Sequence, residues 1–198
     1  LPGKERKISP EERWYKDILL AMQTGLAGYF EKTGAFECIG IALSGGKDSA
    51  LTLIVAWLYA KERLGESSHR MADFIHCFSM PTRFNSDTTK NISRLLCEEL
   101  GVSFKEISIE QAFEREVEAT CSMLGEEQEL SDITRQNIQA RLRGGRMWNW
   151  CNSSQAMWIQ TGNMSEKAVG YTTVGGDLMG AYSLLGNLPK TIVIRLLH

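Results

Sequence analysis

An apolar run at residues 38–43 leads directly into the string Ser-Gly-Gly-Lys-Asp-Ser at 44–49, and a stretch rich in Leu and Ala continues to residue 64. The run Cys-Ile-Gly-Ile-Ala-Leu has no polar alternation, which is typical of a strand buried on both faces. A buried strand that turns at glycines into a helix over residues 48–64 is one βα unit. Such a unit predicts a parallel sheet with helices on its faces.

The same alternation recurs along the chain. We expect strands at 38–43, 74–80, 102–107 and 156–161, and helices from Ser9-Pro10 to Gly34 and at 48–64, 88–100, 111–124, about 134–151 and from about 188–190 onward. The polar segment 125–132 and the glycine-rich segment 170–180 are expected to be loops. Parallel strands need right-handed crossovers. The predicted fold class is therefore α/β, a Rossmann-like parallel sheet flanked by helices, with residues 1–198 forming one domain.

Composition narrows the classes of partner. The 198 residues are 43% hydrophobic, enough for a sizeable core, and the net charge is −2 with no long basic run. We therefore expect neither a nucleic-acid partner nor an anionic membrane surface. No apolar stretch reaches the roughly 18 residues of a membrane helix. Five cysteines stand far apart without a C-x-x-C pair, which favours buried reduced thiols in a cytoplasmic protein. The charge distribution favours small molecules as the partners.

The string at 44–49 predicts a phosphate site. A loop that joins a strand to a helix N-terminus exposes backbone N–H groups, and glycines let a phosphate approach closely. Ser44 and Ser49 add hydroxyl donors, while the carboxylate of Asp48 beside an anion calls for a divalent cation between them. The alternative is a tight turn in which Asp48 only favours the helix dipole. Lys47 either reaches a phosphate or points to solvent.

The spacing S-G-G-x-D-S differs from the pattern G-x-x-x-x-G-K-[ST]. It resembles the signature of the ATP pyrophosphatases, which implies cleavage of ATP between its α and β phosphates. Three further stretches are distinctive: Met80–Ser86, Gln136–Gly144 and Thr161–Tyr171. Together with the string they resemble the NAD synthetase family over nearly the whole chain, most closely the synthetase domain of the glutamine-dependent form.

This resemblance implies an adenine nucleotide alpha hydrolase-like fold and an AMP-forming ligase. In the family, deamido-NAD (nicotinic acid adenine dinucleotide) is adenylated by ATP, pyrophosphate leaves, and ammonia or glutamine-derived ammonia displaces AMP to give NAD. It also implies ATP as a substrate, Mg²⁺ as a cofactor and a homodimer. Members continue past the helix at Lys190-Thr191, so we expect this chain to be truncated at its C-terminus and to use ammonia, free or supplied from elsewhere.

Site roles follow from the matching positions. The resemblance places Ser44, Gly45, Gly46, Lys47, Asp48, Ser49 and Thr161 on ATP, Asp48 and Glu166 on Mg²⁺, Asn137, Arg141, Tyr171, Thr172, Thr173 and Val174 on deamido-NAD, Asp177 in the nucleotide-binding set, and Lys190 near the ATP phosphates or the substrate. Asp48, Glu166 and Lys190 are the expected catalytic residues. The chain departs from the family pattern at Val174, where some members have Lys, and at Gly176, where Tyr is usual.

Plainer roles compete with several of these. Asn163 and Glu166 have the spacing of a capping box. Arg141 and Arg143 could be solvated helix charges, although Asn137 and Arg141 are i, i+4 and we expect Gly144, Gly145 and Trp148 on the same helix face. Trp148, Trp150 and Trp158 are expected in core or dimer packing. Rival functions are a tRNA-thiolating pyrophosphatase and a nucleotide-binding module without turnover.

Overall fold

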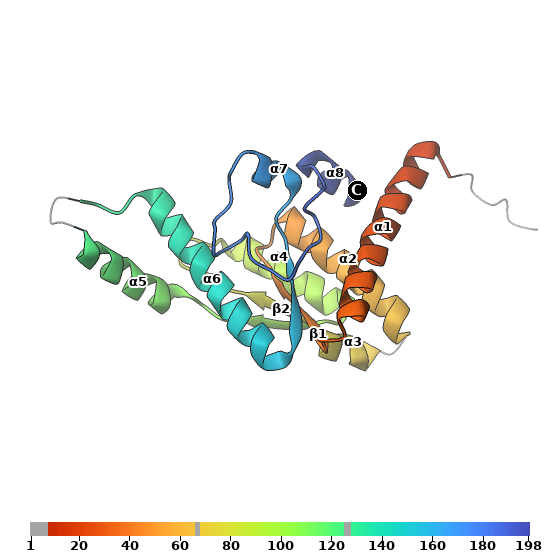
Figure 1. The fold of residues 1–198 in the computed structure, drawn as a ribbon, viewed down its shortest axis with the longest axis horizontal. Helices are drawn as coiled ribbons and strands as arrows, with labels where there is room; N and C mark the ends of the chain where they lie inside the picture. Colours follow the sequence, from red (N-terminus) through yellow and green to blue (C-terminus); the bar gives the residue numbers. More distant parts are fainter. Residues whose placement is uncertain (1–7, 66–67, 125–127) are drawn as a thin grey trace, which may run out of the picture.

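The computed structural model describes residues 8–65, 68–124 and 128–198 (Figure 1). Its centre is an all-parallel five-stranded sheet in the order β3-β2-β1-β4-β5. The strands are β1 Cys38–Ala42, β2 Ile75–Ser79, β3 Ser103–Glu106, β4 Ala156–Gln160 and β5 Tyr182–Ser183. Ile39 of β1 pairs with Ile75 on one side and Met157 on the other. The α/β class and the parallel sheet are thus confirmed.

The helices form two layers, one on each face of the sheet (Figure 1). They are α1 Pro10–Thr33, α2 Lys47–Leu64, α3 Ser68–Phe74, α4 Asp87–Leu100, α5 Glu110–Met123, α6 Asp132–Ser154, α7 Met164–Ala168 and α8 Lys190–Leu196. Ile39 and Ile41 belong to the main core with α1 and α2, whereas Cys38 belongs to a second core with α6. Successive side chains of β1 point to opposite faces, so both layers bury it.

The cap residues explain where the two longest helices begin and end. Ser9 and Glu12 form a capping box at the start of α1, and Gly34 closes that helix at φ 60°. Helix α6 begins at Asp132, earlier than expected, because Ser131 accepts a hydrogen bond from the N–H of Thr134. It continues past the expected end at Cys151 and stops where Gln155 turns left-handed, at φ 48°.

Two elements were not expected. Helix α3 occupies the residues before β2, so that strand begins at Ile75 rather than Phe74, whose ring packs against that of Phe30 at 5.3 Å between centroids. Strand β5 has two residues, and Tyr182 pairs with Ile159 at the edge of β4. Residues 125–127 of the expected loop lie outside the described residues.

The cysteines and tryptophans largely match their expected places. Cys38, Cys77, Cys97 and Cys151 are buried free thiols, whereas Cys121 is exposed on α5, so the expectation of burial is wrong for that residue. Trp148 packs edge-on against Trp158 at 5.2 Å between centroids, as expected for core tryptophans. Within the described ranges, no helix is both long and apolar enough to cross a bilayer.

Candidate active site

A cavity of about 580 Å³ opens at the carboxyl ends of β1, β2 and β4. The strand order places β2 and β3 on one side of β1 and β4 and β5 on the other, so the crossovers reverse direction between β1 and β4. Ligands of open α/β sheets bind at such a switch point, and a volume of this size suits a small-molecule site. Leu43, Met80 and Thr161, which follow the three strands, all line the cavity.

The loop at 44–49 sits at this switch point and is held by its own serines. Ser49 Oγ donates to the carbonyl of Gly46 at 3.0 Å, Ser44 Oγ accepts from the N–H of Gly46 at 3.3 Å, and the two hydroxyls lie 3.3 Å apart. Gly45 has φ 77°, which favours glycine. Gly46, the N-cap of α2, has no side chain that could occupy the first amides of the helix. Those amides can therefore receive an anion.

Asp48 enters a small polar network beside this loop. Its Oδ2 forms an ion pair with Lys190 Nζ, and its Oδ1 accepts from Asn163 Nδ2 at 2.9 Å. Asn163 is fully buried and also closes a capping box with Glu166, whose Oε2 accepts from the N–H of Asn163 at 3.2 Å. The capping role of Glu166 is thus present in the structure. One buried asparagine ties the two carboxylates Asp48 and Glu166 to the same wall of the cavity.

These two carboxylates suit Mg²⁺ only if the ligand completes the coordination. Mg²⁺ prefers oxygen ligands and is commonly bound by one or two carboxylates plus substrate phosphates. Among the described residues, no group of three or more His, Cys, Asp or Glu side chains is close enough to hold a metal ion unaided. Asp48 and Glu166 next to the phosphate loop therefore fit a metal that arrives with a nucleotide.

The opposite wall consists of α6 and the segment 171–178. Thr173 Oγ1 donates to Asn137 Oδ1 at 2.7 Å, and its N–H donates to Asp177 Oδ1 at 2.7 Å. Arg141 Nε donates to the carbonyl of Val174 at 3.1 Å. Several residues expected to bind substrate therefore bind one another and fix this segment along the helix.

Close approach of two backbones makes glycine necessary here. A Cβ on Gly176 would lie 2.8 Å from the carbonyl carbon of Ala140, and a Cβ on Gly144 would lie 3.0 Å from the carbonyl oxygen of Gly175. The contact with α6 thus leaves no room for a side chain at Gly176. The expected common face of α6 is wrong in part, because Gly144 faces this contact whereas Gly145 lines a second cavity.

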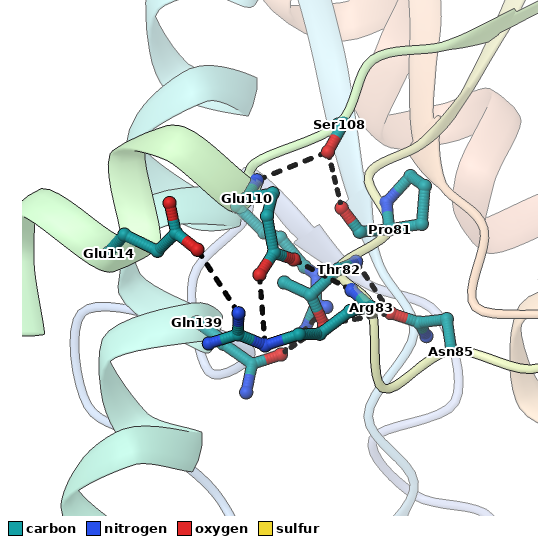
Figure 2. Close-up of polar contacts among 9 residues, drawn as sticks. Pro81, Thr82, Arg83, Asn85, Ser108, Glu110, Glu114 and Gln139 are labelled. Atoms are coloured by element: carbon teal, nitrogen blue, oxygen red, sulfur yellow. Dashed lines mark hydrogen bonds and ion pairs between the residues drawn. The ribbon is translucent and has the colours of Figure 1, made fainter.

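A third wall is the segment after β2, which a polar network joins to α5 and α6 (Figure 2). Thr82 Oγ1 donates to Gln139 Oε1 at 3.1 Å, and the N–H of Thr82 donates to Asn85 Oδ1 at 2.8 Å. Arg83 lies between Glu110 and Glu114, at 3.2 and 3.1 Å from their carboxylate oxygens. This network fixes the conformation of the segment at the cavity edge.

The structure brings most of the expected site residues to one cavity. Those that line it are Ser44, Asp48, Ser49, Asn137, Thr161, Glu166, Tyr171, Thr172, Thr173 and Asp177. Gly45, Gly46, Lys47, Val174 and Lys190 adjoin it in the loops and helix starts described above, and Lys47 is exposed at the first turn of α2. Arg141 instead lines the second cavity, of about 410 Å³, between α5 and α6.

Arg143 and Gln160 line the main cavity but were not assigned to it from sequence. The signal for Arg143 was present as periodicity. The residues of α6 that line the cavity are Ile133, Gln136, Asn137, Ala140, Arg143 and Gly144. These positions repeat with helical spacing and include Arg143, but not Arg141. Gln160, whose Nε2 donates to the carbonyl of Asp177 at 2.9 Å, had no comparable signal.

Known proteins are similar to this chain in sequence and in fold. The family model described as NAD synthase matches residues 18–198. Glutamine-dependent NAD(+) synthetases from Rhodobacter capsulatus and Thermotoga maritima are 36% and 32% identical, over 88% and 97% of this chain but 29% and 31% of their own lengths. The chain thus spans less than a third of these relatives.

Solved structures agree. Glutamine-dependent NAD+ synthetase from Acinetobacter baumannii, in complex with ADP, superposes with a TM-score of 0.79 at 26% identity, over 98% of this chain and 34% of that one. NMN synthetase from Francisella tularensis gives 0.73 at 25% identity, over 96% and 70%. With a family match over most of its length, the chain belongs to the NAD synthase family.

Proposed function

We propose that this chain is a single ATP pyrophosphatase domain that amidates deamido-NAD to NAD, with release of AMP and pyrophosphate. One observation carries the proposal. A single cavity joins the phosphate loop at 44–49, the carboxylates Asp48 and Glu166, and the wall formed by α6 with 171–178. The first two can hold the triphosphate of ATP, and the third leaves room for an acceptor beside its α-phosphate.

The proposed reaction has two steps. A carboxylate oxygen of the nicotinate group attacks the α-phosphorus of ATP, the bond from that phosphorus to the bridging oxygen breaks, and pyrophosphate leaves. Ammonia then attacks the carboxyl carbon, the carbon–oxygen bond to AMP breaks, and a proton is lost to solvent. Neither step needs a protein nucleophile, so positioning and charge neutralisation supply most of the rate.

The chain's own residues supply those two effects. The amides at the start of α2 and the hydroxyls of Ser44 and Ser49 would hold the leaving pyrophosphate. Lys190, which neutralises Asp48 in the structure, is the nearby cation that a phosphate could attract. Asp48 and Glu166 would hold Mg²⁺, which offsets phosphate charge when bound.

A product assay tests this function. The chain is incubated with ATP, Mg²⁺, deamido-NAD and ammonium, and NAD, AMP and pyrophosphate are measured. We expect all three in equal amounts. Formation of ADP and phosphate, or no product at all, would contradict the proposal, and nucleotide binding without products would support a module without turnover. Transfer of sulfur to tRNA is the outcome expected of the thiolating alternative.

The nitrogen donor and the acceptor are separate arms of the same assay. We expect ammonium to support NAD formation and glutamine alone to fail, because amide hydrolysis would need a separate catalytic centre. One structural neighbour is an NMN synthetase. The mononucleotide acid is therefore offered as a competing acceptor, and we expect the dinucleotide to be preferred.

We also propose that the protein is a homodimer in the cytoplasm. The five free thiols are consistent with a reducing compartment. The dimer rests on the family resemblance alone. Light scattering after size exclusion is expected to give twice the chain mass of 22.2 kDa, and a single mass of one chain at micromolar concentration would contradict the dimer.

A further inference from the structure

Three arginines of α6 each donate to a main-chain carbonyl of a different loop. Arg141 bonds Val174, Arg143 Nε bonds the carbonyl of Met80 at 2.9 Å, and Arg146 Nη1 bonds that of Ser108 at 2.8 Å. Arg141 and Arg146 line the second cavity, whereas only Arg143 of the three lines the main one. The three arginines thus make similar hydrogen bonds to main-chain carbonyls, but only the guanidinium of Arg143 belongs to the wall of the main cavity.

The guanidinium of Arg143 is held by hydrogen bonds and has no ion-pair partner among the residues that the structure describes. Besides the Met80 carbonyl, it has one side-chain partner, the neutral Gln139, whose Oε1 accepts from Nη2 at 3.3 Å. It forms no ion pair with any carboxylate in the described part of the chain. The carboxylates that reach this region from α5, Glu110 and Glu114, are paired with Arg83 (Figure 2).

Arg143 is partly buried, which makes the lack of an anionic partner unfavourable. Desolvation lowers the pKa of the Arg143 guanidinium from its usual value, with no opposing carboxylate to raise it. A cation that is partly removed from water without an anionic partner is destabilised, and a ligand anion can relieve that cost. The planar group also matches a carboxylate or a phosphate geometrically.

We propose that Arg143 is a substrate-binding residue that donates to an anionic oxygen of the bound ligand, either a phosphate or the nicotinate carboxylate. Gln139 and the carbonyl of Met80 hold its guanidinium toward the cavity. The identity of these ligands rests on the proposed function. The observation that Arg143 is anchored in the cavity wall without an ion pair among the described residues is independent of the proposed function.

Equilibrium calorimetry without turnover tests the proposal on the full chain. The phosphate arm compares AMP with adenosine, and the carboxylate arm compares deamido-NAD with NAD, which differ at the nicotinate group alone. We expect Arg143→Met to weaken AMP or deamido-NAD at least about tenfold, as for loss of a charge-assisted hydrogen bond. The member of the affected pair that lacks the tested anionic group, adenosine or NAD, should change less than about twofold, which identifies the source of the anion.

Two further variants separate binding from support of the loop. Gln139→Glu places a carboxylate beside Arg143 while nearly preserving side-chain shape, so it should weaken the same anionic ligand severalfold and leave adenosine unchanged. It also keeps the test available if Arg143→Met does not fold. Arg146→Met, which removes an equivalent anchor outside the main cavity, should leave all four affinities unchanged.

The outcomes are distinct. Equal weakening of adenosine and AMP, together with equal weakening of NAD and deamido-NAD, would show that Arg143 only supports the segment after β2 and would overturn the proposal. Wild-type affinities in both Arg143→Met and Gln139→Glu would overturn it while NAD formation still supported the proposed function. A wild-type chain that binds neither AMP nor deamido-NAD would overturn both.

Discussion

The two principal walls of the cavity are built in different ways. The phosphate loop forms its serine contacts within six residues, directly after β1. The wall of α6 and 171–178 depends on contacts such as Asn137 to Thr173 and Arg141 to Val174, which join residues 36 and 33 positions apart. A local turn can be encoded by a short string, whereas the second wall exists only when α6 has docked on the sheet. We therefore expect the first wall to govern chemistry and the second to govern acceptor binding and local stability.

The largest expected effect comes from Asp48→Asn in the first wall. Loss of one carboxylate beside the phosphates should reduce AMP formation by about 100-fold or more. Asp48 is 15% exposed and its partner Lys190 is 40% exposed, so the free energy of unfolding should change by about 1 kcal/mol or less. Rate and urea denaturation are measured together, with Glu118→Gln on the exposed face of α5 as a charge-matched control. A normal rate would remove the metal role of Asp48.

Gly176→Ala should act through the second wall. The new Cβ would meet Ala140 at 2.8 Å, so the segment 171–178 has to move away from α6. We expect the KM for deamido-NAD to rise about tenfold and the unfolding free energy to fall by about 1–3 kcal/mol. Gly28→Ala on α1, whose Cβ meets nothing within 4 Å, is the control. If the KM for ATP rose instead, the division between the walls would fail.

Asn163 links Asp48 and Glu166 and caps α7, so two substitutions can divide its roles. Asn163→Ala removes both and should cost about 1–2 kcal/mol of stability, while Asn163→Ser keeps a capping oxygen and should cost less. Both lose the bond from Nδ2 to Asp48, so both should lower the rate of AMP formation. Equal rates for Asn163→Ser and wild type would show that the capping role is sufficient.

Adjacent glycines of α6 offer a finer comparison. Gly145→Ala has open space around its Cβ and should stabilise the helix by about 0.5–1 kcal/mol. Gly144→Ala should gain the same helix stability from replacing glycine. Its Cβ, however, would lie 3.0 Å from the carbonyl oxygen of Gly175, and this close contact should cancel the gain. Denaturant midpoints measure the difference. Equal stabilisation by the two substitutions would indicate that the segment 171–178 can move away from α6 without a loss of unfolding free energy.

The smallest signal reports whether α6 itself moves in these variants. Burial raises the pKa of Cys38 to about 11 and that of Cys151 to about 12, so both remain protonated thiols at pH 8. We expect one fast-labelled thiol, the exposed Cys121, in wild type and in Gly144→Ala. Fast labelling of Cys151 in the variant would show that the whole helix has moved away from the sheet.

The same two thiols make stability depend on pH. Since the pKa values of Cys38 and Cys151 are raised on folding, their contribution to stability is lost as pH rises above about 9 toward 12.

Local signals in the sequence were sufficient for much of the fold and for the first wall. The apolar runs, Ser9, Gly34 and the string at 44–49 predict elements that the structure contains. The two residues of β5 are too few to show periodicity, and only pairing with β4 makes them a strand. Helix α3 has seven residues, which make only about two helical turns.

For the second wall, sequence identified many of the residues but not their contacts. Asn137 and Thr173 were assigned to a substrate, and their hydrogen bond to each other depends on tertiary docking. Arg141 was assigned from the family resemblance, with its i, i+4 spacing to Asn137 in agreement, yet the full periodicity of α6 turns Arg143 toward the main cavity. An i, i+4 pair defines a helix face too loosely when neighbouring positions carry the same residue type.

The strand order has a consequence for dividing this polypeptide. A cut between Met123 and Asp132 would leave β1, β2 and β3 with the phosphate loop on one fragment, and α6, β4 and Glu166 on the other. Neither fragment would contain a whole cavity, because its walls belong to both. A nucleotide that contacts both walls would favour their reassembly by mass action, so the ligand would act as a noncovalent cross-link between the two halves of the sheet.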